Sequence, residues 1–184
     1  MKVFKFGGAS VKDAQGVKNL VQILKKYQND MPLVVVSAMG KTTNALEEVA
    51  KAFYLKQDDT FKLLEKVKTF HQGILEDLFP KNHSVFDAVT NLFVEVEWAL
   101  EDEPRPEYPY EYDQIVSIGE LISTTIISAY LKEVEIANYW LDARDVLKTD
   151  NKHQSANIDW VLSAQLIHKY VPKDTLTITQ GFIA

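Results

Sequence analysis

The sequence has no cysteine among its 184 residues, and this absence excludes disulfide bonds and metal sites built on thiolates. Basic residues are outnumbered, because 20 lysines and arginines face 26 aspartates and glutamates and give a net charge of -6. No basic tract offsets this balance, so we do not expect nucleic acid as a main partner. The chain also lacks long apolar runs and an opening secretory signal, and we expect an untargeted, cytoplasmic protein without a membrane span.

Glycine is scarce, with 7 residues, while 46% of the chain is apolar and 25% is charged. This composition is typical of a globular protein rather than a disordered or fibrous one. The length suffices for one domain with its own core, or for part of a larger domain.

The first stretch combines a strand pattern with a glycine turn. Val3, Phe4 and Phe6 suit a buried strand, and Lys5 stands where another apolar side chain is expected. Gly7 and Gly8 follow, and because they lack a Cβ the backbone there can take positive φ and bring its N–H groups close to an anion.

A helix is predicted after this turn. Asp13 is its expected N-cap, and the apolar residues at helical spacing are Val17, Leu20, Val21 and Leu24. A lysine, bare backbone and a helix N-terminus thus favour a phosphate site, although a tight turn beside a surface lysine would leave the same pattern.

The apolar run Leu33–Val36 follows Met31-Pro32 and predicts a second strand, buried on both faces. Strand, helix and strand in this order form a βαβ unit, which predicts an α/β fold with a parallel sheet. Gly7-Gly8 and the segment 37–40 then both follow the carboxyl ends of strands, where such sheets bind ligands.

The segment Ser37–Asn44 contains Gly40-Lys41-Thr42, which has the letters of a nucleotide-binding P-loop. That motif needs a glycine five residues before Gly40, where this chain has Val35. We therefore expect an ordinary loop, with a helix that begins near Asn44 or Ala45 and is capped by Thr43 or Asn44.

Residues 44–100 have the apolar spacing of about three helices, interrupted at Pro80. His71 and His83 lie there without partners at metal-ligand spacing, so we expect core or surface histidines. The acidic, proline-rich segment 101–109 is predicted to be an exposed loop.

A further helix is predicted to run to about Leu131, with an apolar stripe that places Glu120 on the opposite, exposed side. Residues 134–140 alternate as a third strand would. Asp142 and Arg144 are expected to form a local ion pair. A helix over 158–168 and a strand over 176–180 complete the pattern.

Several of these segments carry a family resemblance. Lys5-Phe6-Gly7-Gly8-Ala9-Ser10-Val11 resembles the opening signature of aspartokinases in the amino-acid kinase family, although a hydroxyl residue is usual at Ala9. The segments 37–44, 117–123, 142–149 and 179–184 are similar to further aspartokinase motifs.

The resemblance implies a three-layer α/β/α fold of the amino-acid kinase or carbamate kinase type, with a mainly parallel sheet and a helical excursion. It covers only the amino-terminal, amino-acid-substrate lobe of the catalytic domain, over residues 1–184. We therefore expect an incomplete fold without the nucleotide-binding half and the regulatory ACT domains, negligible activity of these residues alone, and a homo-oligomer at full length.

The implied reaction transfers the γ-phosphoryl group of ATP to the side-chain carboxylate of L-aspartate, for lysine, threonine and methionine synthesis. By resemblance Lys5 is catalytic and neutralises the phosphoryl group, and donors to its oxygens come from Gly7, Gly8 and Ser10. The residues expected to hold aspartate are Ser37, Thr43, Glu120 and Phe182. Mg²⁺ is expected with ATP, but no ligand is assigned to it.

Two alternatives remain open. The first is another amino-acid kinase, of the glutamate or carbamate type, which shares the opening glycines. The second is a dimerising module without catalytic activity.

Overall fold

The computed structural model describes residues 2–183. Its sheet has four parallel strands in the order β1-β2-β4-β3. The strands are β1 (Val3–Phe6), β2 (Leu33–Val36), β3 (Tyr139–Leu141) and β4 (Thr177–Gln180). The parallel order confirms the α/β fold predicted from the first βαβ unit.

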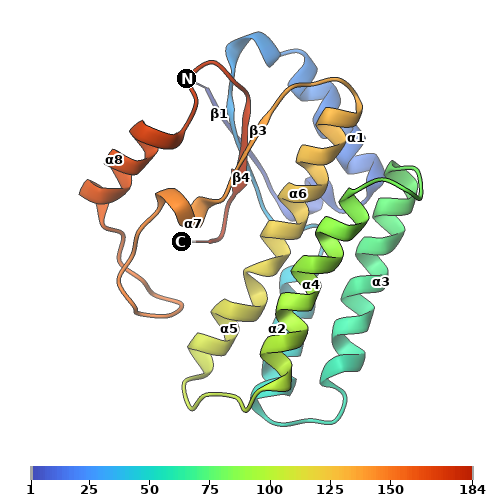
Figure 1. Cartoon of the computed structure of the whole chain (residues 1–184), viewed down its shortest axis with the longest axis vertical. Coiled ribbons are helices and arrows are strands. Elements are labelled where there is room, and N and C mark those ends of the chain that lie inside the picture. The colour runs from blue at the N-terminus through green and yellow to red at the C-terminus, as the bar shows by residue number, and fades with distance from the viewer. Residues whose placement is uncertain (1, 184) are drawn as a thin grey trace.

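Helices lie on both sides of the strands. They are α1 (Ala14–Lys25), α2 (Thr42–Tyr54), α3 (Thr60–Leu78), α4 (Val85–Glu101), α5 (Tyr108–Val116), α6 (Ile118–Glu133), α7 (Ala143–Val146) and α8 (Trp160–Tyr170), with 3₁₀ turns η1 (Gly8–Val11) and η2 (Gln28–Asp30). Figure 1 shows α7 and α8 on one side of the strands and α1 and α6 on the other. Helices α2 to α5 extend beyond the sheet and form the predicted helical excursion.

The two faces of the sheet differ because neighbouring residues of a strand point to opposite sides. The face with Val34, Val36 and Ile178 is fully buried in the core. β1 lies at the edge of the sheet, and its side chains on the opposite face are open to solvent: Val3 is 60% exposed and Lys5 is also exposed. The expectation of a buried first strand was therefore wrong, and Lys5 occupies its position because that face of the edge strand is open.

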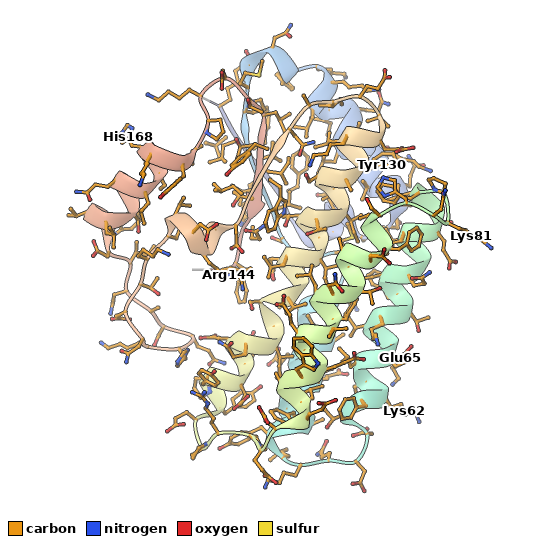
Figure 2. All side chains as sticks on the ribbon, in the orientation of Figure 1. Lys62, Glu65, Lys81, Tyr130, Arg144 and His168 are labelled. Carbon is orange, nitrogen blue, oxygen red and sulfur yellow. The ribbon has the colours of Figure 1, made fainter. Side chains whose placement is uncertain are left out.

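Helix α6 is buried on nearly all sides. Together α5 and α6 form the stretch Tyr108–Glu133, which has the length and apolar composition that a membrane-spanning helix would need. The most apolar window of this stretch is 72% buried inside the protein, as in a core helix. In contrast, α3 is amphipathic, and Figure 2 shows its Lys62 and Glu65 pointing outward.

Some predicted boundaries were wrong. Helix α2 begins at Thr42 and Lys41 precedes it without a side-chain cap, so neither Thr43 nor Asn44 is the cap. The third strand is confined to Tyr139–Leu141, because the chain at 134–138 still turns away from α6 and Glu135 has a positive φ of 60°. The loop predicted at 101–109 is shorter, since α4 ends at Glu101 and α5 begins at Tyr108.

His71 of α3 is a core histidine, as predicted, with no exposed surface. Its Nδ1 lies 2.8 Å from the carbonyl oxygen of Val67. Burial lowers the pKa of His71 from 6.5 to about 4, because a charged imidazole would lose its hydration there.

We expect His71 to make the protein less stable as the pH falls from about 6.5 to 4. Over this range the unfolded chain takes up a proton that the folded chain refuses, which lowers the free energy of unfolding by up to about 3 kcal/mol. Urea unfolding at several pH values checks this against His71→Gln, whose pH dependence should be flatter. The exposed His168→Gln is the matched control.

Burial raises the pKa of the Glu120 carboxyl, so protonation of this group as the pH falls favours the folded state. Its effect on the free energy of unfolding is therefore opposite in sign to that of His71. The difference between the free energies of unfolding of wild type and His71→Gln at each pH therefore isolates the contribution of the histidine. Parallel curves for wild type and His71→Gln would contradict the prediction.

Candidate functional site

Three loops meet at the carboxyl edge of the sheet. The last residues of β1, β2 and β4, namely Phe6, Val36 and Gln180, are in register. The Ser37 N–H donates to the Phe6 carbonyl at 3.0 Å, and the Gly181 N–H donates to the Val36 carbonyl at 3.1 Å. The loops after these strands therefore leave the sheet at one level and border the same region.

The glycines of these loops have different roles from those we predicted. Gly7 has an extended conformation with φ of -79°, and the positive φ belongs to Gly40, at 57°. A Cβ at Gly8 would lie 2.6 Å from the Ala38 carbonyl oxygen and 2.9 Å from that of Gly40. Gly8 is thus required by the close approach of two loops, which is fixed by the Gly40 N–H donating to the Gly8 carbonyl at 3.0 Å.

Gly7 and Lys5 remain open at this edge. A Cβ at Gly7 would meet no atom within 4 Å. Lys5 forms no ion pair with any residue of 2–183. Ser10, five residues later in the sequence, is also exposed. Asp13 caps α1 as predicted, accepting from the Gly16 N–H at 2.8 Å. The turn nevertheless leads first into η1, so the α1 terminus does not follow the glycines directly.

Glu120 is buried at this edge, with 1% of its surface exposed, although the apolar pattern placed it outside. Helix α6 is packed on all sides, so its stripe does not mark a single buried face. The Ala38 N–H donates to Glu120 Oε1 at 3.1 Å, while Oε2 is buried without a hydrogen-bond partner among the described residues. Burial raises the pKa of this carboxyl, and the Ala38 hydrogen bond partly opposes that shift.

Two neighbours of Glu120 bring α6 close to loop 37–41. The Ser123 hydroxyl donates to the Ser37 carbonyl at 2.8 Å. A Cβ at Gly119 would lie 3.1 Å from Ala38 Cβ and 3.2 Å from Thr42 Cγ2, so glycine permits the contact. Thr43 follows on α2 and is half-buried.

A polar network beneath the site was missed from the sequence. The Gln180 side chain donates to Thr124 Oγ1 at 2.8 Å and accepts from the Ala143 N–H at 2.7 Å. Trp140 Nε1 donates to the same hydroxyl at 3.0 Å. The available signal was a glutamine at the end of the predicted last strand, four residues before the chain's last residue.

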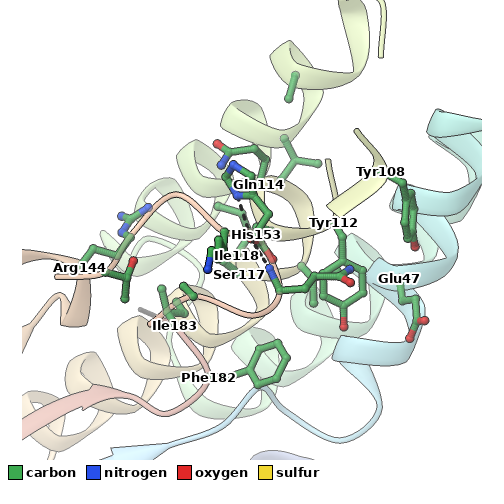
Figure 3. A pocket seen from close by; sticks show the side chains of 18 of the residues that line it. Glu47, Tyr108, Tyr112, Gln114, Ser117, Ile118, Arg144, His153, Phe182 and Ile183 are labelled. Atoms are coloured by element: carbon green, nitrogen blue, oxygen red, sulfur yellow. Dashed lines mark hydrogen bonds and ion pairs between the residues drawn. The ribbon is translucent and has the colours of Figure 1, made fainter. Parts of the chain in front are cut away.

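A cleft of about 780 Å³ lies beside this edge, between α5 and the segment 149–156. Figure 3 shows Phe182 at one wall and Tyr108 and Glu47 at another. Phe182 is the one candidate site residue that lines this cleft, whereas Ser10 lines a second cleft of about 510 Å³ next to α1. The structure thus joins the glycine turn, loop 37–41 and Glu120 by contacts, and leaves Phe182 at a neighbouring opening.

The predicted ion pair between Asp142 and Arg144 is confirmed. Arg144 Nη2 lies 2.6 Å from Asp142 Oδ2, and Nε contacts both carboxylate oxygens. This pair raises the pKa of Arg144 and shapes the start of α7.

Comparison with known proteins gives a consistent result. Residues 1–184 match the family described as the amino acid kinase family. Lysine-sensitive aspartokinase 3 of Escherichia coli K12 is 32% identical over an alignment of 184 positions that covers 98% of this chain and 40% of that protein. The aspartokinase of Chlamydia trachomatis is 31% identical, over 98% of this chain and 39% of its own length.

Solved structures agree in fold. Escherichia coli aspartokinase III in complex with lysine and aspartate superposes with a TM-score of 0.89 at 30% identity, over 99% of this chain and 41% of that chain. The complex of the same enzyme with aspartate and ADP gives 0.88 at 28% identity, over 99% and 40%. The chain spans about 40% of the length of the relatives it matches.

The two adjacent glycines should respond differently to alanine. Gly8→Ala should lower the free energy of unfolding by about 1–3 kcal/mol, because the new methyl group meets two backbone carbonyls that cannot yield cheaply. Gly7→Ala, with open space and an ordinary φ, is the matched control and should be near neutral. Chemical unfolding of both variants measures the difference, and equal stabilities would refute the close approach of the two loops.

Proposed function

Because this chain belongs to the amino acid kinase family, we propose that it forms the amino-acid-binding lobe, over residues 1–184, of an aspartokinase. The reaction is ATP-dependent phosphorylation of the side-chain carboxylate of L-aspartate to 4-phospho-L-aspartate, the first step of lysine, threonine and methionine biosynthesis. The observation that carries this proposal is the buried Glu120 carboxylate with one unpartnered oxygen.

A buried carboxylate oxygen without a donor is costly, so it favours a ligand that supplies one. The α-ammonium group of aspartate is such a donor, and a charge-assisted hydrogen bond to Oε2 would complement the Ala38 N–H on Oε1. The ammonium charge would also favour the ionised carboxyl, against the effect of burial on its pKa. We assign Ser37, Thr43 and Phe182 to the rest of the amino acid.

The phosphoryl group would lie at the glycine turn. Lys5 carries an exposed ammonium without an ion pair in the described part of the chain, and Gly7 leaves its backbone accessible. With Gly8 and Ser10 these groups would neutralise charge on the transferring phosphoryl. A carboxylate oxygen of aspartate bonds to the γ-phosphorus as the bond to the oxygen bridging the β-phosphate breaks, and no proton has to be removed.

The nucleotide and its accompanying Mg²⁺ have different support in the described residues and the relatives. The aspartate and ADP complex of the E. coli relative supports both substrates. Residues 2–183 contain no group of three histidine, aspartate or glutamate side chains that could hold a metal ion by themselves, so we expect Mg²⁺ to be held mainly by the ATP phosphates. No step described above depends on that ion.

The relatives are more than twice as long as this chain, so we expect phosphoryl transfer from a polypeptide that includes their remaining part, and negligible turnover from the 184 residues alone. We further propose a cytoplasmic enzyme that forms a homo-oligomer. Nucleic acid and membranes have no part in this proposal.

Glu120→Gln should weaken aspartate binding by roughly 10- to 100-fold, since a charge-assisted hydrogen bond is worth about 1.5–3 kcal/mol. Isothermal titration of the chain with L-aspartate measures this. Glu47→Gln is the matched control, because Glu47 lines the 780 Å³ cleft and is exposed. A loss confined to Glu47→Gln would move the substrate into that cleft and refute the assignment.

Lys5→Ala in the longer enzyme should reduce kcat by ~10²–10³, because it removes a donor aimed at developing charge. Lys2→Ala is the control, since Lys2 precedes the same strand and is paired with Asp30. A coupled ADP-release assay compares the two variants. Equal activities would argue against a role of Lys5 in phosphoryl transfer.

A further inference from the structure

His71 lies directly behind the loop that contacts Glu120. Its Nε2 is 3.3 Å from Thr42 Oγ1, at the first residue of α2. The Thr42 hydroxyl in turn donates to the Met39 carbonyl at 2.6 Å, and the Thr42 N–H donates to the same carbonyl at 3.0 Å. The turn 39–42 is thus closed by Thr42, and a buried imidazole is its neighbour on the side of α3.

The hydrogen-bond directions define the state of the imidazole. A carbonyl oxygen accepts only, so the Nδ1 facing Val67 carries a proton. In the neutral imidazole the other nitrogen, Nε2, therefore carries no proton. Nε2 faces Thr42 as a hydrogen-bond acceptor. Thr42 has a single hydroxyl proton and two acceptors, the Met39 carbonyl and His71 Nε2.

The imidazole is held firmly in this orientation. Its ring lies 5.0 Å from that of Phe70 and 5.8 Å from that of Phe93, in edge contacts. Phe70 also packs near Gly40, where a Cβ would lie 3.4 Å from its Cζ. Residues 70 and 71 of α3 therefore support the same turn, one by packing and one by a polar contact.

This turn adjoins the atoms assigned to substrate binding. Ala38 directly precedes it and donates to Glu120 Oε1, and Gly40 within it bonds to Gly8. Thr43 follows Thr42 on α2. A shift of the Met39 carbonyl would therefore be transmitted to Glu120 on one side and Thr43 on the other.

We propose that His71 is a positioning residue for the aspartate site, acting through the Thr42 hydroxyl on the turn 39–42. The expected effect on aspartate affinity rests on the proposed function. The action of His71 on the turn through Thr42 does not. His71 Nε2 is the second acceptor, so the buried Thr42 hydroxyl can keep a hydrogen bond when the turn adjusts to substrate. The turn then has two arrangements, one with the hydroxyl bonded to the Met39 carbonyl and one with it bonded to His71.

The test is a double-mutant cycle on the 184-residue chain. His71→Phe keeps a ring and removes the acceptor, and Thr42→Val keeps the shape and removes the hydroxyl. Each should weaken L-aspartate binding by about 2- to 10-fold, as expected for one hydrogen bond, and change hydrogen exchange at the Ala38 and Gly40 amides. The double variant should lose no more than Thr42→Val alone, because His71 acts through Thr42.

Conservative variants and a packing control sharpen the result. His71→Gln and Thr42→Ser retain the polar groups and should match wild type in aspartate affinity and in exchange at the Ala38 and Gly40 amides. Phe93→Leu disturbs the same ring contact and should lower overall stability without a selective effect on the two amides. Additive losses in the double variant, or His71→Phe behaving as Phe93→Leu, would overturn the proposal.

The wild-type chain provides a test that needs no variant. Nitrogen-15 spectra of His71 should show a protonated Nδ1 and an unprotonated Nε2 at pH 7, and the reverse tautomer would also overturn the proposal. If the wild type binds no aspartate, the proposed function fails, while the exchange and tautomer measurements still decide the role of His71.

Discussion

The contact between loop 37–41 and the start of α6 is the constraint on which the site depends. A buried carboxylate needs hydrogen-bond donors, and within residues 2–183 the Glu120 carboxylate has only the Ala38 N–H. That single bond requires α6 to approach the loop closely, which Gly119 permits, and requires the loop to lie against Gly8. Glycines at two positions thus allow one acidic group to be buried at the edge of the sheet with an oxygen left over.

The same constraint explains why the site combines rigid and open parts. Loop 37–41 is bonded to β1, to α6 and, through Thr42, to the core histidine. The proposed amino-acid side of the site is therefore tied to three elements, while the turn 39–42 within it has two acceptors for the Thr42 hydroxyl. Lys5 on the edge strand and Gly7 just after it are exposed, so the side to which we assign the phosphoryl group is open.

Local patterns predicted much of the fold. The βαβ unit, the Asp13 cap and the three helices after it follow from apolar spacing and turn residues, and all are present. The pattern failed for Glu120, because α6 is buried all round and its apolar stripe carries no information on which side is open. It also failed for the glycines: Gly8 and Gly119 are required by contacts with residues distant in the sequence, Gly40 by its positive φ, and Gly7 by neither.

By itself the sequence determined the order of strands and helices and, through its motifs, the residues that deserved attention as a phosphate and amino-acid site. These are local properties, set by backbone preference and by periodicity within about ten residues. Only the tertiary structure decided that β1 is an edge strand, that Glu120 is buried with one free oxygen, and that His71 supports the loop from behind. Each of these depends on segments separated by about 30 to 80 residues, and such proximity is created by packing and is absent from any local pattern.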